Sequence, residues 1–486
     1  MKPFLKKSWP FLVLAILSFT IHLAFLSYPS QVVFDEVHFG KFVGAYFTGQ
    51  YYFDIHPPLG KLIIAGWAKL NGVNPVFDFE KIGEQIPAQT LFVLRFLPAF
   101  FGGLFVLTVS WLAWLISRSK KVALIAGLLI LLDNAFLIQS RFILVDIFML
   151  TFEVLCFCFF FLYQRQKSFG AKWFGYLILT GAFFGLTISV KWTGLATIGI
   201  IGVVLLAKIF SRKLADYLNS SISVIPAKAG IQTPRPQIKS GTTKWIQIKE
   251  ALTGLIILIT IGLAIYAIPF YIHLKLLPDS GPGDPFMSQA FQRELKGGGN
   301  ELTFLQKFTE LNQKMFFYNS TLKSNHPYSS RWYTWPLDYK LIYYWNQNQQ
   351  DNQDVWAGKI YFMGNPVLWW LAGGLIAVTL IQLTTKKGRQ KKPIVYILVL
   401  AYFANLLPFI FVSRVAFLYH YLASALFAIL LFSFLLSDFW PQKKLFAGIL
   451  FFIFISFILF LPLSYGIQVP ASFDRLESKL INPLVR

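Results

Sequence analysis

The amino-acid sequence predicts an all-α polytopic membrane protein. The 486-residue chain is 56% hydrophobic and only 14% charged, and its mean hydropathy is +0.57. This composition is typical of a chain that is surrounded mainly by lipid. Apolar stretches of the length that crosses a bilayer, about 20 residues, recur along the sequence.

About eleven such stretches are predicted to be transmembrane helices, and they form a single transmembrane domain over residues 1–486. The two cysteines, Cys156 and Cys158, lie two residues apart inside one stretch. On a helix they point in different directions, so neither a disulfide nor a cysteine metal site is expected. The predicted spans are 9–27, 98–117, 122–139, 142–163, 174–190, 194–210, 250–273, 366–384, 394–412, 416–436 and 444–464.

Positive charge predicts the orientation of these helices. The chain has 44 Lys and Arg against 22 Asp and Glu, and the cations cluster in alternate connections between the apolar stretches. Such clusters mark cytoplasmic loops that face anionic lipid, so we expect a cytoplasmic N-terminus and no nucleic-acid partner. The basic connections lie near 118–121, 165–172, 212–249, 386–392 and 443–444.

Two long segments, 28–97 and 274–365, then lie on the external side. The second is rich in aromatic residues from His326 to Pro336, which is typical either of an interfacial belt or of a cover over a site. The cytoplasmic connection 211–249 is polar and contains three prolines between Ser220 and Lys244. We interpret it as a flexible loop that carries an insertion.

The first external segment carries two acidic patches beside the first span. One contains Asp35 and Glu36, and the other contains Asp54, His56 and Pro57. Ionisable groups at a membrane are costly and are usually kept for chemistry or transport. These patches are therefore the candidate active site.

Isolated charges at otherwise apolar helix ends fall on the same side as this acidic pair. A single charge of this kind is often a side chain that extends to the interface. Several together favour a site for an anionic lipid head group. The charges are Arg141, Asp146, Lys191 and Arg414.

These motifs resemble the protein O-mannosyltransferase family. Residues 34–60 are similar to its first luminal loop, in which Asp-Glu is followed by His-Phe-Gly and later by Asp-x-His-Pro-Pro-Leu. The resemblance covers nearly the whole chain and is to the compact prokaryotic branch, since 274–365 is too short for the β-trefoil repeat domain of eukaryotic relatives. Further similar stretches are 94–98, 132–135, 140–146, 189–195, 326–328, 364–370 and 414–421.

The resemblance implies a C-type glycosyltransferase fold and an inverting transfer of mannose. The donor would be a polyprenyl (dolichyl-type) monophosphate carrier, and the acceptors would be Ser or Thr hydroxyls of secreted or membrane proteins. A related transferase that modifies a lipid or glycan, similar to an aminoarabinose transferase, is the alternative. A transporter is a third class, but the charges gather at one face and no inverted repeat is visible.

The resemblance also implies residue roles. A serine hydroxyl needs a proton acceptor, for which we expect Asp35. Glu36 is expected to position the acceptor or sugar hydroxyls within the catalytic pair. The departing phosphate needs fixed cations, for which we expect first Arg141 and then Lys191 and Arg414. The candidates for binding acceptor or sugar are Asp54, His56, Pro57, Arg95, Asp146 and His326.

No cofactor is expected to be required, although Glu36, Asp54 and His56 carry atoms that can bind a divalent metal. Glu153 lies in the middle of a predicted span, where we expect an interhelical hydrogen bond. The expected partners are the donor lipid, acceptor proteins, the bilayer and the secretion machinery. The expected location is the prokaryotic plasma membrane, with the active site on the external face.

Overall fold

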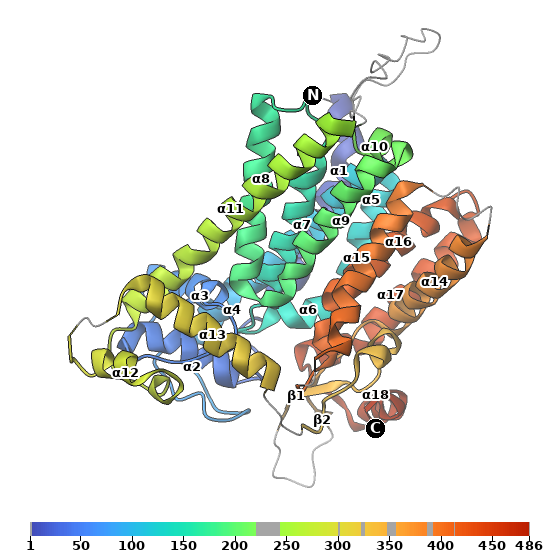
Figure 1. Cartoon of the computed structure of the whole chain (residues 1–486). Helices are drawn as coiled ribbons and strands as arrows, with labels where there is room; N and C mark the ends of the chain where they lie inside the picture. The colour runs from blue at the N-terminus through green and yellow to red at the C-terminus, as the bar shows by residue number, and fades with distance from the viewer. Residues whose placement is uncertain are drawn as a thin grey trace.

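The computed structural model describes residues 2–219, 244–299, 302–321, 326–347, 356–385, 392–412 and 414–485. Most of the predicted cytoplasmic insertion, residues 220–243, lies outside the described residues. The described chain is a bundle of long helices with a layer of short helices and strands at one end (Figure 1). The N-terminus lies at the opposite end of the bundle from this layer.

Long apolar helices build the bundle. Nine of the described helices are long and apolar enough to cross a membrane, or ten if one bent pair counts as a span. The protein is therefore an integral membrane protein with multiple spans. The bundle helices are α1 (Lys2–Leu23), α4 (Ala88–Ser117), α5 (Lys120–Leu131), α6 (Asn134–Arg141), α7 (Asp146–Tyr163), α8 (Ala171–Val190), α9 (Ala196–Phe210), α11 (Lys244–Leu276), α14 (Pro366–Thr384), α15 (Pro393–Leu406), α16 (Leu422–Asp438) and α17 (Lys443–Tyr465).

One predicted span, 122–139, is wrong as a continuous helix. It is broken into α5 and α6, which are bent by 61° relative to each other. At the break, the carboxylate of Asp133 accepts hydrogen bonds from the backbone N–H groups of Ala135 and Phe136 and so starts a new helix. The first predicted span is also shorter than expected, because its described apolar helix covers only Trp9–Leu23.

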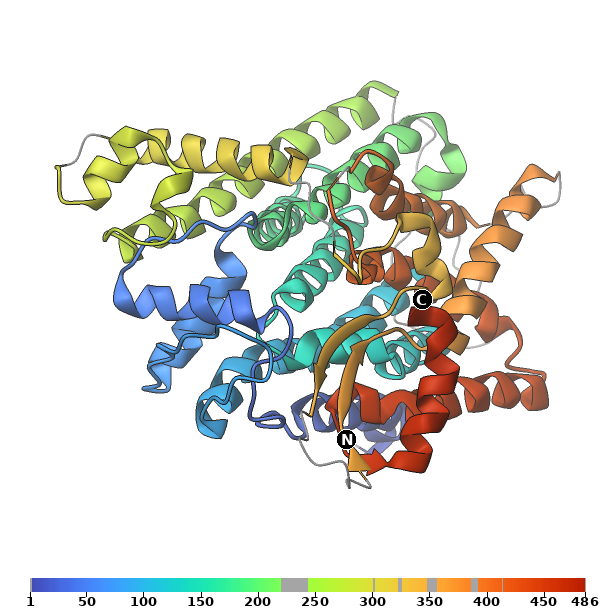
Figure 2. The same ribbon diagram turned by 90° about the horizontal axis from the view of Figure 1, so that it is seen from below.

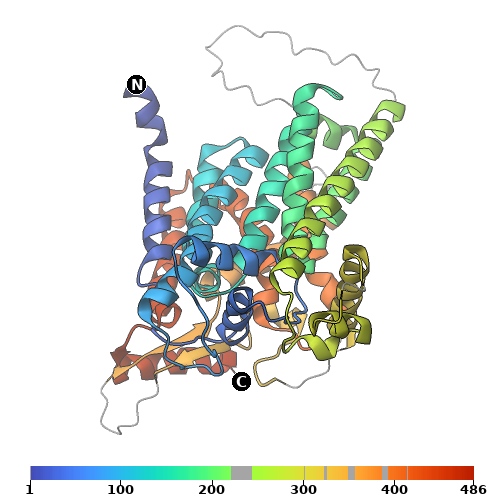
Figure 3. The ribbon, with the colours of Figure 1, turned by 90° about the vertical axis from the view of Figure 1, so that its left-hand side faces the viewer.

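Helix α7 is at the centre of the bundle. Its spanning window is 83% buried and that of α16 is 78% buried, whereas those of α17 and α11 are 22% and 28% buried. Helices α8 and α11 run side by side along one flank (Figure 3). The first residue of α7 is Asp146, so the helix best enclosed by protein delivers one of the predicted site residues.

The two long predicted loops are folded. The first contains α2 (Glu36–Thr48) and α3 (Leu59–Leu70), and α4 begins ten residues before the predicted start at 98. Seen from below, these helices and a β-hairpin lie across the end of the bundle (Figure 2). The remaining elements are α10 (Arg212–Asn219), α12 (Gln289–Leu295), α13 (Phe304–Thr321), α18 (Ala471–Val485), β1 (Ile342–Asn346), β2 (Trp356–Ala357), β3 (Lys359–Phe362), β4 (Val469–Pro470) and the 3₁₀ turns η1 (Trp192–Leu195), η2 (Asp284–Phe286), η3 (Trp332–Leu337), η5 (Leu407–Ile410) and η6 (Leu418–Tyr421).

The hairpin fixes the loop that carries Asp35. Strands β1 and β3 are antiparallel, with Ile342 opposite Phe362, and β2 pairs with β4. The Phe34 N–H donates to the Tyr344 carbonyl at 3.1 Å, and the two rings stack with centroids 4.3 Å apart. The backbone immediately before Asp35 is thus held by the second external segment.

Candidate active site

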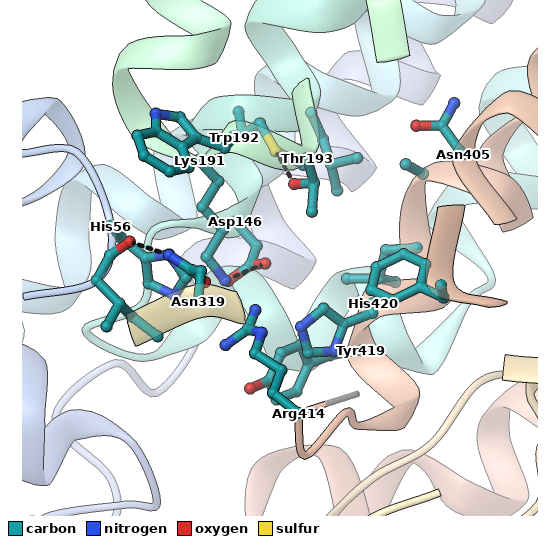
Figure 4. Close-up of a pocket in the computed structure, with 16 residues that line it drawn as sticks. His56, Asp146, Lys191, Trp192, Thr193, Asn319, Asn405, Arg414, Tyr419 and His420 are labelled. Carbon is teal, nitrogen blue, oxygen red and sulfur yellow. Dashed lines mark hydrogen bonds and ion pairs between the residues drawn. The ribbon is translucent and has the colours of Figure 1, made fainter. Parts of the chain in front are cut away.

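A small cavity of about 60 Å³ lies where the bundle meets the end layer. Five separate parts of the chain line it: the first external segment, the start of α7, the α8–η1 junction, α13, and the chain between α15 and α16 (Figure 4). The charged or titratable side chains in its wall are His56, Asp146, Lys191, Arg414 and His420. Four of these five belong to motifs that were singled out for their charge.

Lys191 is held by an ion pair across the cavity wall. Its Nζ lies 2.7 Å from Asp146 Oδ1. The other oxygen of Asp146 accepts from Gln139 Nε2 at 3.0 Å, and Gln139 Oε1 accepts from the Tyr344 hydroxyl at 2.9 Å. The lysine follows the last turn of α8 with an extended backbone, so the end of that helix and the start of α7 define its position.

Arg414 is the second cation of the cavity. Its guanidinium points into the cavity beside Asn319 and His420 (Figure 4). Within the described part of the chain, its side chain makes no hydrogen bond or ion pair, whereas Lys191 is neutralised by Asp146. Burial lowers the pKa of Arg414, and Tyr419 and Asp54 oppose this effect. The N–H groups of the Arg414 guanidinium are therefore available to bind an anion.

Asp35 lies beside this cavity. Burial raises the pKa of its carboxyl to about 7; Lys191 acts in the opposite direction, and Asp146 and Asp54 add to the rise. The described residues give its carboxylate no hydrogen bond or ion pair. It precedes α2 but does not cap it with its side chain. An unpaired carboxylate with a pKa near neutrality fits the demands on a general base.

Glu36 has a different environment. Its carboxylate accepts from Arg95 Nε and Nη2 at 2.8 and 2.7 Å and from the N–H groups of Val33 and Ile143 at 2.8 and 2.9 Å. Arg95 also donates to three carbonyls of the chain between α1 and α2. Both side chains are fully buried. The structure does not bring Glu36 or Arg95 into the cavity, and their contacts serve to hold the Asp35 loop on the bundle.

Arg141, the residue expected first for the carrier phosphate, is also absent from the cavity wall. Because α6 is bent away from α5, Arg141 turns towards the end of α1, where it donates to the carbonyls of Ala24 and Phe25 at 2.6 and 3.2 Å. Its guanidinium lies 3.8 Å from the ring centroid of Tyr465. Of the three cations expected at the carrier phosphate, Lys191 and Arg414 line the cavity and Arg141 does not.

The Asp54-His56-Pro57 patch is divided. Asp54 forms an ion pair with Lys61, which also donates to the His56 carbonyl at 2.8 Å. The His56 ring lines the cavity, and burial, with added repulsion from Lys191 and Arg414, holds its pKa well below the ordinary value. A neutral imidazole can donate to or accept from a sugar hydroxyl. Pro57 is buried just before α3.

His326 lies outside the cavity. Its Nδ1 accepts from the Tyr328 N–H at 3.2 Å, and its ring packs against Phe417 at 5.0 Å. Burial lowers its pKa. The expectation that it binds acceptor or sugar is thus not supported by the cavity, although Phe417 is a near neighbour of Tyr419 and His420.

Sequence reasoning missed several cavity residues. Tyr419 and His420 lie in the stretch that follows Arg414, so that motif could have indicated them. Asn319 comes from α13 and donates to the Ile55 carbonyl at 2.9 Å. A single amide on a helix far away in the sequence carries no recognisable signal. The same holds for Asn405 at the end of α15.

A groove continues from the cavity towards the side of the bundle. It has a volume of about 390 Å³ and lies between η1 and the start of α9 on one side and the end of α15 on the other. Asn319, Asn405 and Arg414 border both spaces. The outer lining is apolar, and Leu195 and Phe411 are 48% and 87% exposed there. The cationic cavity thus opens onto an apolar side passage.

No group of three or more His, Cys, Asp or Glu side chains that could hold a metal ion occurs in the described residues. Of the three candidate ligands, Glu36 pairs with Arg95 and Asp54 pairs with Lys61. Of the three, only His56 lines the cavity. These three residues therefore do not form a metal centre in this arrangement.

Comparisons with known proteins cover most of the chain. Residues 12–278 match the family model for dolichyl-phosphate-mannose-protein mannosyltransferase, and residues 304–480 match the C-terminal four-span region of protein O-mannosyltransferase. Protein O-mannosyltransferase 1 of Drosophila melanogaster is 33% identical over 297 residues, which is 61% of this chain and 30% of that protein. The mannosyltransferase 1 of Saccharomyces cerevisiae is 32% identical over 284 residues, which is 58% of this chain and 32% of that protein. The matches span about a third of these relatives.

Solved structures confirm the fold. The S. cerevisiae Pmt1–Pmt2 protein O-mannosyltransferase complex bound to its sugar donor matches with a TM-score of 0.81, 20% identity, and coverage of 95% of this chain and 90% of that chain. ArnT from Cupriavidus metallidurans in the apo state gives 0.50 at 14% identity, over 90% and 61% of the two chains. The predicted all-α polytopic, C-type glycosyltransferase fold is correct.

Proposed function

The chain belongs to the dolichyl-phosphate-mannose-protein mannosyltransferase family, and we propose that it moves mannose from a polyprenyl (dolichyl-type) monophosphate carrier to Ser or Thr hydroxyls of secreted or membrane proteins. The proposal rests on one observation: the Asp35 carboxylate, which has no ion-pair partner among the described residues, lies next to a cavity lined by the cations Lys191 and Arg414. An inverting transfer from a phosphate carrier needs these two features side by side.

In the proposed reaction, Asp35 accepts the proton of the Ser or Thr hydroxyl as its oxygen attacks the anomeric carbon of mannose. The bond from that carbon to the phosphate oxygen breaks, and the electron pair leaves with the lipid phosphate. Arg414 and Lys191 stabilise the charge that grows on this phosphate. Asp146 has an orienting role, because it holds Lys191 at 2.7 Å.

The side groove supports a lipid carrier. A phosphate that binds between Arg414 and Lys191 would have its isoprenoid chain directed into the apolar passage between α9 and α15. Arg414 borders both spaces, so it marks the boundary between polar head and apolar tail. A soluble sugar nucleotide would have no use for this passage, and it would usually require a metal for its diphosphate.

We extend the proposal to location, cofactor and partners. The site lies at the opposite end of the bundle from the N-terminus, so a cytoplasmic N-terminus would place it on the external face of a prokaryotic plasma membrane. No metal is required, because the leaving group is a monophosphate that two cations can stabilise. Acceptor selection rests on this compact core or on the secretion machinery.

The test is a reconstituted assay. The purified protein in lipid nanodiscs is mixed with polyprenyl-phosphate mannose and Ser- or Thr-containing peptides, and mass spectrometry locates any added hexose. We expect one hexose per modified hydroxyl and none with a peptide in which Ala replaces every Ser and Thr. Transfer to a lipid or glycan, with unmodified peptide, would instead indicate a transferase of the same fold with another acceptor.

A further inference from the structure

A buried carboxyl beneath the cavity has no role in the reaction described above. Glu153 lies in the middle of α7 and is fully buried, and neither of its oxygens makes a hydrogen bond within the described part of the chain. The partners for the predicted interhelical hydrogen bond are nevertheless in place, because Thr197 and Asn405 are hydrogen-bonding neighbours of the carboxyl. An ionised carboxylate without a partner is very costly in such surroundings, so Glu153 is a neutral carboxylic acid.

Two polar side chains from other helices face this acid. They are Thr197 of α9 and Asn405 of α15. The hydroxyl of Thr197 is buried and also lacks a hydrogen-bond partner. Asn405 donates one amide hydrogen to the Ala401 carbonyl at 3.0 Å, which leaves its Oδ1 and its second N–H unused. The only other titratable neighbour is Cys156, on α7 itself, among the residues that the structure describes.

The position of this cluster connects it with the proposed carrier site. Asn405 borders both the cavity and the side groove. Met149 and Leu150, one turn of α7 before Glu153, also line the cavity. The three helices that meet at Glu153 are thus the central helix and the two helices that form the walls of the groove.

Counting donors and acceptors shows how the cluster can be satisfied. A neutral carboxylic acid has one O–H donor and one carbonyl acceptor. The Thr197 hydroxyl can donate to the Glu153 carbonyl oxygen, and the Glu153 O–H can donate to Asn405 Oδ1. The hydrogen bond from Glu153 and the one to the Ala401 carbonyl together fix the amide plane of Asn405, whose second N–H is then available at the junction of cavity and groove.

We propose that Glu153 is a positioning residue that, through Asn405, presents an amide N–H to the carrier where its phosphate meets its isoprenoid chain. The inference rests on the proposed function, because it assumes a lipid phosphate in the cavity. Glu153 and Asn405 then contribute to the affinity for the carrier and take no part in proton transfer.

The experiment measures the Kd of polyprenyl phosphate for the full-length protein in nanodiscs, together with the KM and kcat of transfer. Glu153→Leu removes both hydrogen bonds at similar volume, and we expect Kd and KM to rise about tenfold, the usual effect of one lost hydrogen bond, with little change in kcat. Glu153→Gln keeps a donor and an acceptor, so its Kd should stay within about threefold of the native value.

Thr379→Val is the matched control. Thr379 of α14 is also fully buried with an unpartnered hydroxyl, and α14 contributes no residue to the cavity or the groove. Its loss should change thermal stability and leave Kd unaltered. A Kd for Glu153→Leu equal to that of Thr379→Val, or a Glu153→Gln variant as weak as Glu153→Leu, would overturn the inference.

Coupling gives a second measurement. Asn405→Leu should weaken binding as much as Glu153→Leu, and the double variant should be no weaker than either single variant. If the increases in Kd of the two single variants multiply in the double variant, Glu153 does not act through Asn405. If the native protein binds polyprenyl phosphate but mannosylates no peptide, the proposed function fails while the binding comparison still decides this inference.

Discussion

Asp35 and Glu36 are neighbours in the sequence with opposite surroundings. Glu36 accepts four hydrogen bonds, two of them from Arg95, whereas the carboxylate of Asp35 receives none from the described residues. Glu36 anchors the loop, and Asp35 is left reactive beside Lys191. The two adjacent acids are therefore expected to have different roles, Glu36 in stability and Asp35 in catalysis.

Replacing Asp35 with Asn should abolish transfer. The amide keeps the size of the side chain but cannot take the proton of the acceptor hydroxyl, and loss of a general base costs about 10²–10⁴-fold in rate. Turnover is measured with the purified variant, and retained binding of polyprenyl phosphate serves as the control for folding. Turnover close to that of the native protein would contradict the assignment of Asp35.

The activity should depend on pH through Asp35. Its pKa of about 7 means that the base is protonated in acid, so kcat/KM should rise with pH and level off above about 7. Stability should change in the opposite direction. The folded state binds the Asp35 proton more tightly than the unfolded state, in which the pKa of Asp is about 4. The free energy of unfolding should therefore decrease as the pH rises from about 4 to 7. Thermal unfolding of the native protein and of Asp35→Asn at pH 5 and 8 measures this, and an equal difference at both pH values would contradict it.

Arg414→Ala and Arg141→Ala should have different effects. Arg414 faces the cavity without a partner, so its loss should lower kcat/KM for the carrier by about 10²-fold and change stability little. Arg141 donates to the Ala24 and Phe25 carbonyls, so its loss should cost about 1–3 kcal/mol of stability. Carrier kinetics and thermal unfolding are measured for both variants. If Arg141→Ala were the one with impaired carrier use, the site would be misplaced.

Glu36→Gln should destabilise the protein. It leaves the Arg95 charge buried without its partner, which typically costs 3–5 kcal/mol. The expected result is a lower unfolding temperature with an unchanged pH profile for the remaining activity. A double variant with Arg95→Met should recover part of the stability, because it removes the unpaired charge. A selective fall in kcat at native stability would indicate a catalytic role for Glu36.

Removal of divalent metal should leave transfer unchanged. Glu36, Asp54 and Asp146 are each paired with a cation, namely Arg95, Lys61 and Lys191. The assay is run after treatment with EDTA and again with added Mg²⁺ or Mn²⁺. Activity that disappears on chelation and returns with a metal would refute the proposal.

Hydropathy predicted most of the transmembrane helices, because lipid requires long apolar segments with internal hydrogen bonds. It did not predict the break at Asp133, since the two short polar side chains of Asp133 and Asn134 interrupt the apolar stretch too briefly to change the average. The sequence did not show that Asp133 caps a new helix; the structure shows this at the bend between α5 and α6.

For the candidate site, charge patterning singled out Asp146, Lys191 and Arg414, and these three residues line one cavity. It could not predict that Arg141 lies outside that wall, because a position near a helix end predicts depth in the membrane and not the direction around the helix axis. The contribution of α13 through Asn319 could not be foreseen either, since it depends on long-range packing.

The stacked rings of Phe34 and Tyr344, and the hydrogen bond from the Tyr344 hydroxyl to Gln139, link three segments that are far apart in the sequence. The hairpin therefore sets the position of the backbone immediately before the proposed proton acceptor. Mutations in a segment remote in sequence from Asp35 would displace that backbone without touching the cavity.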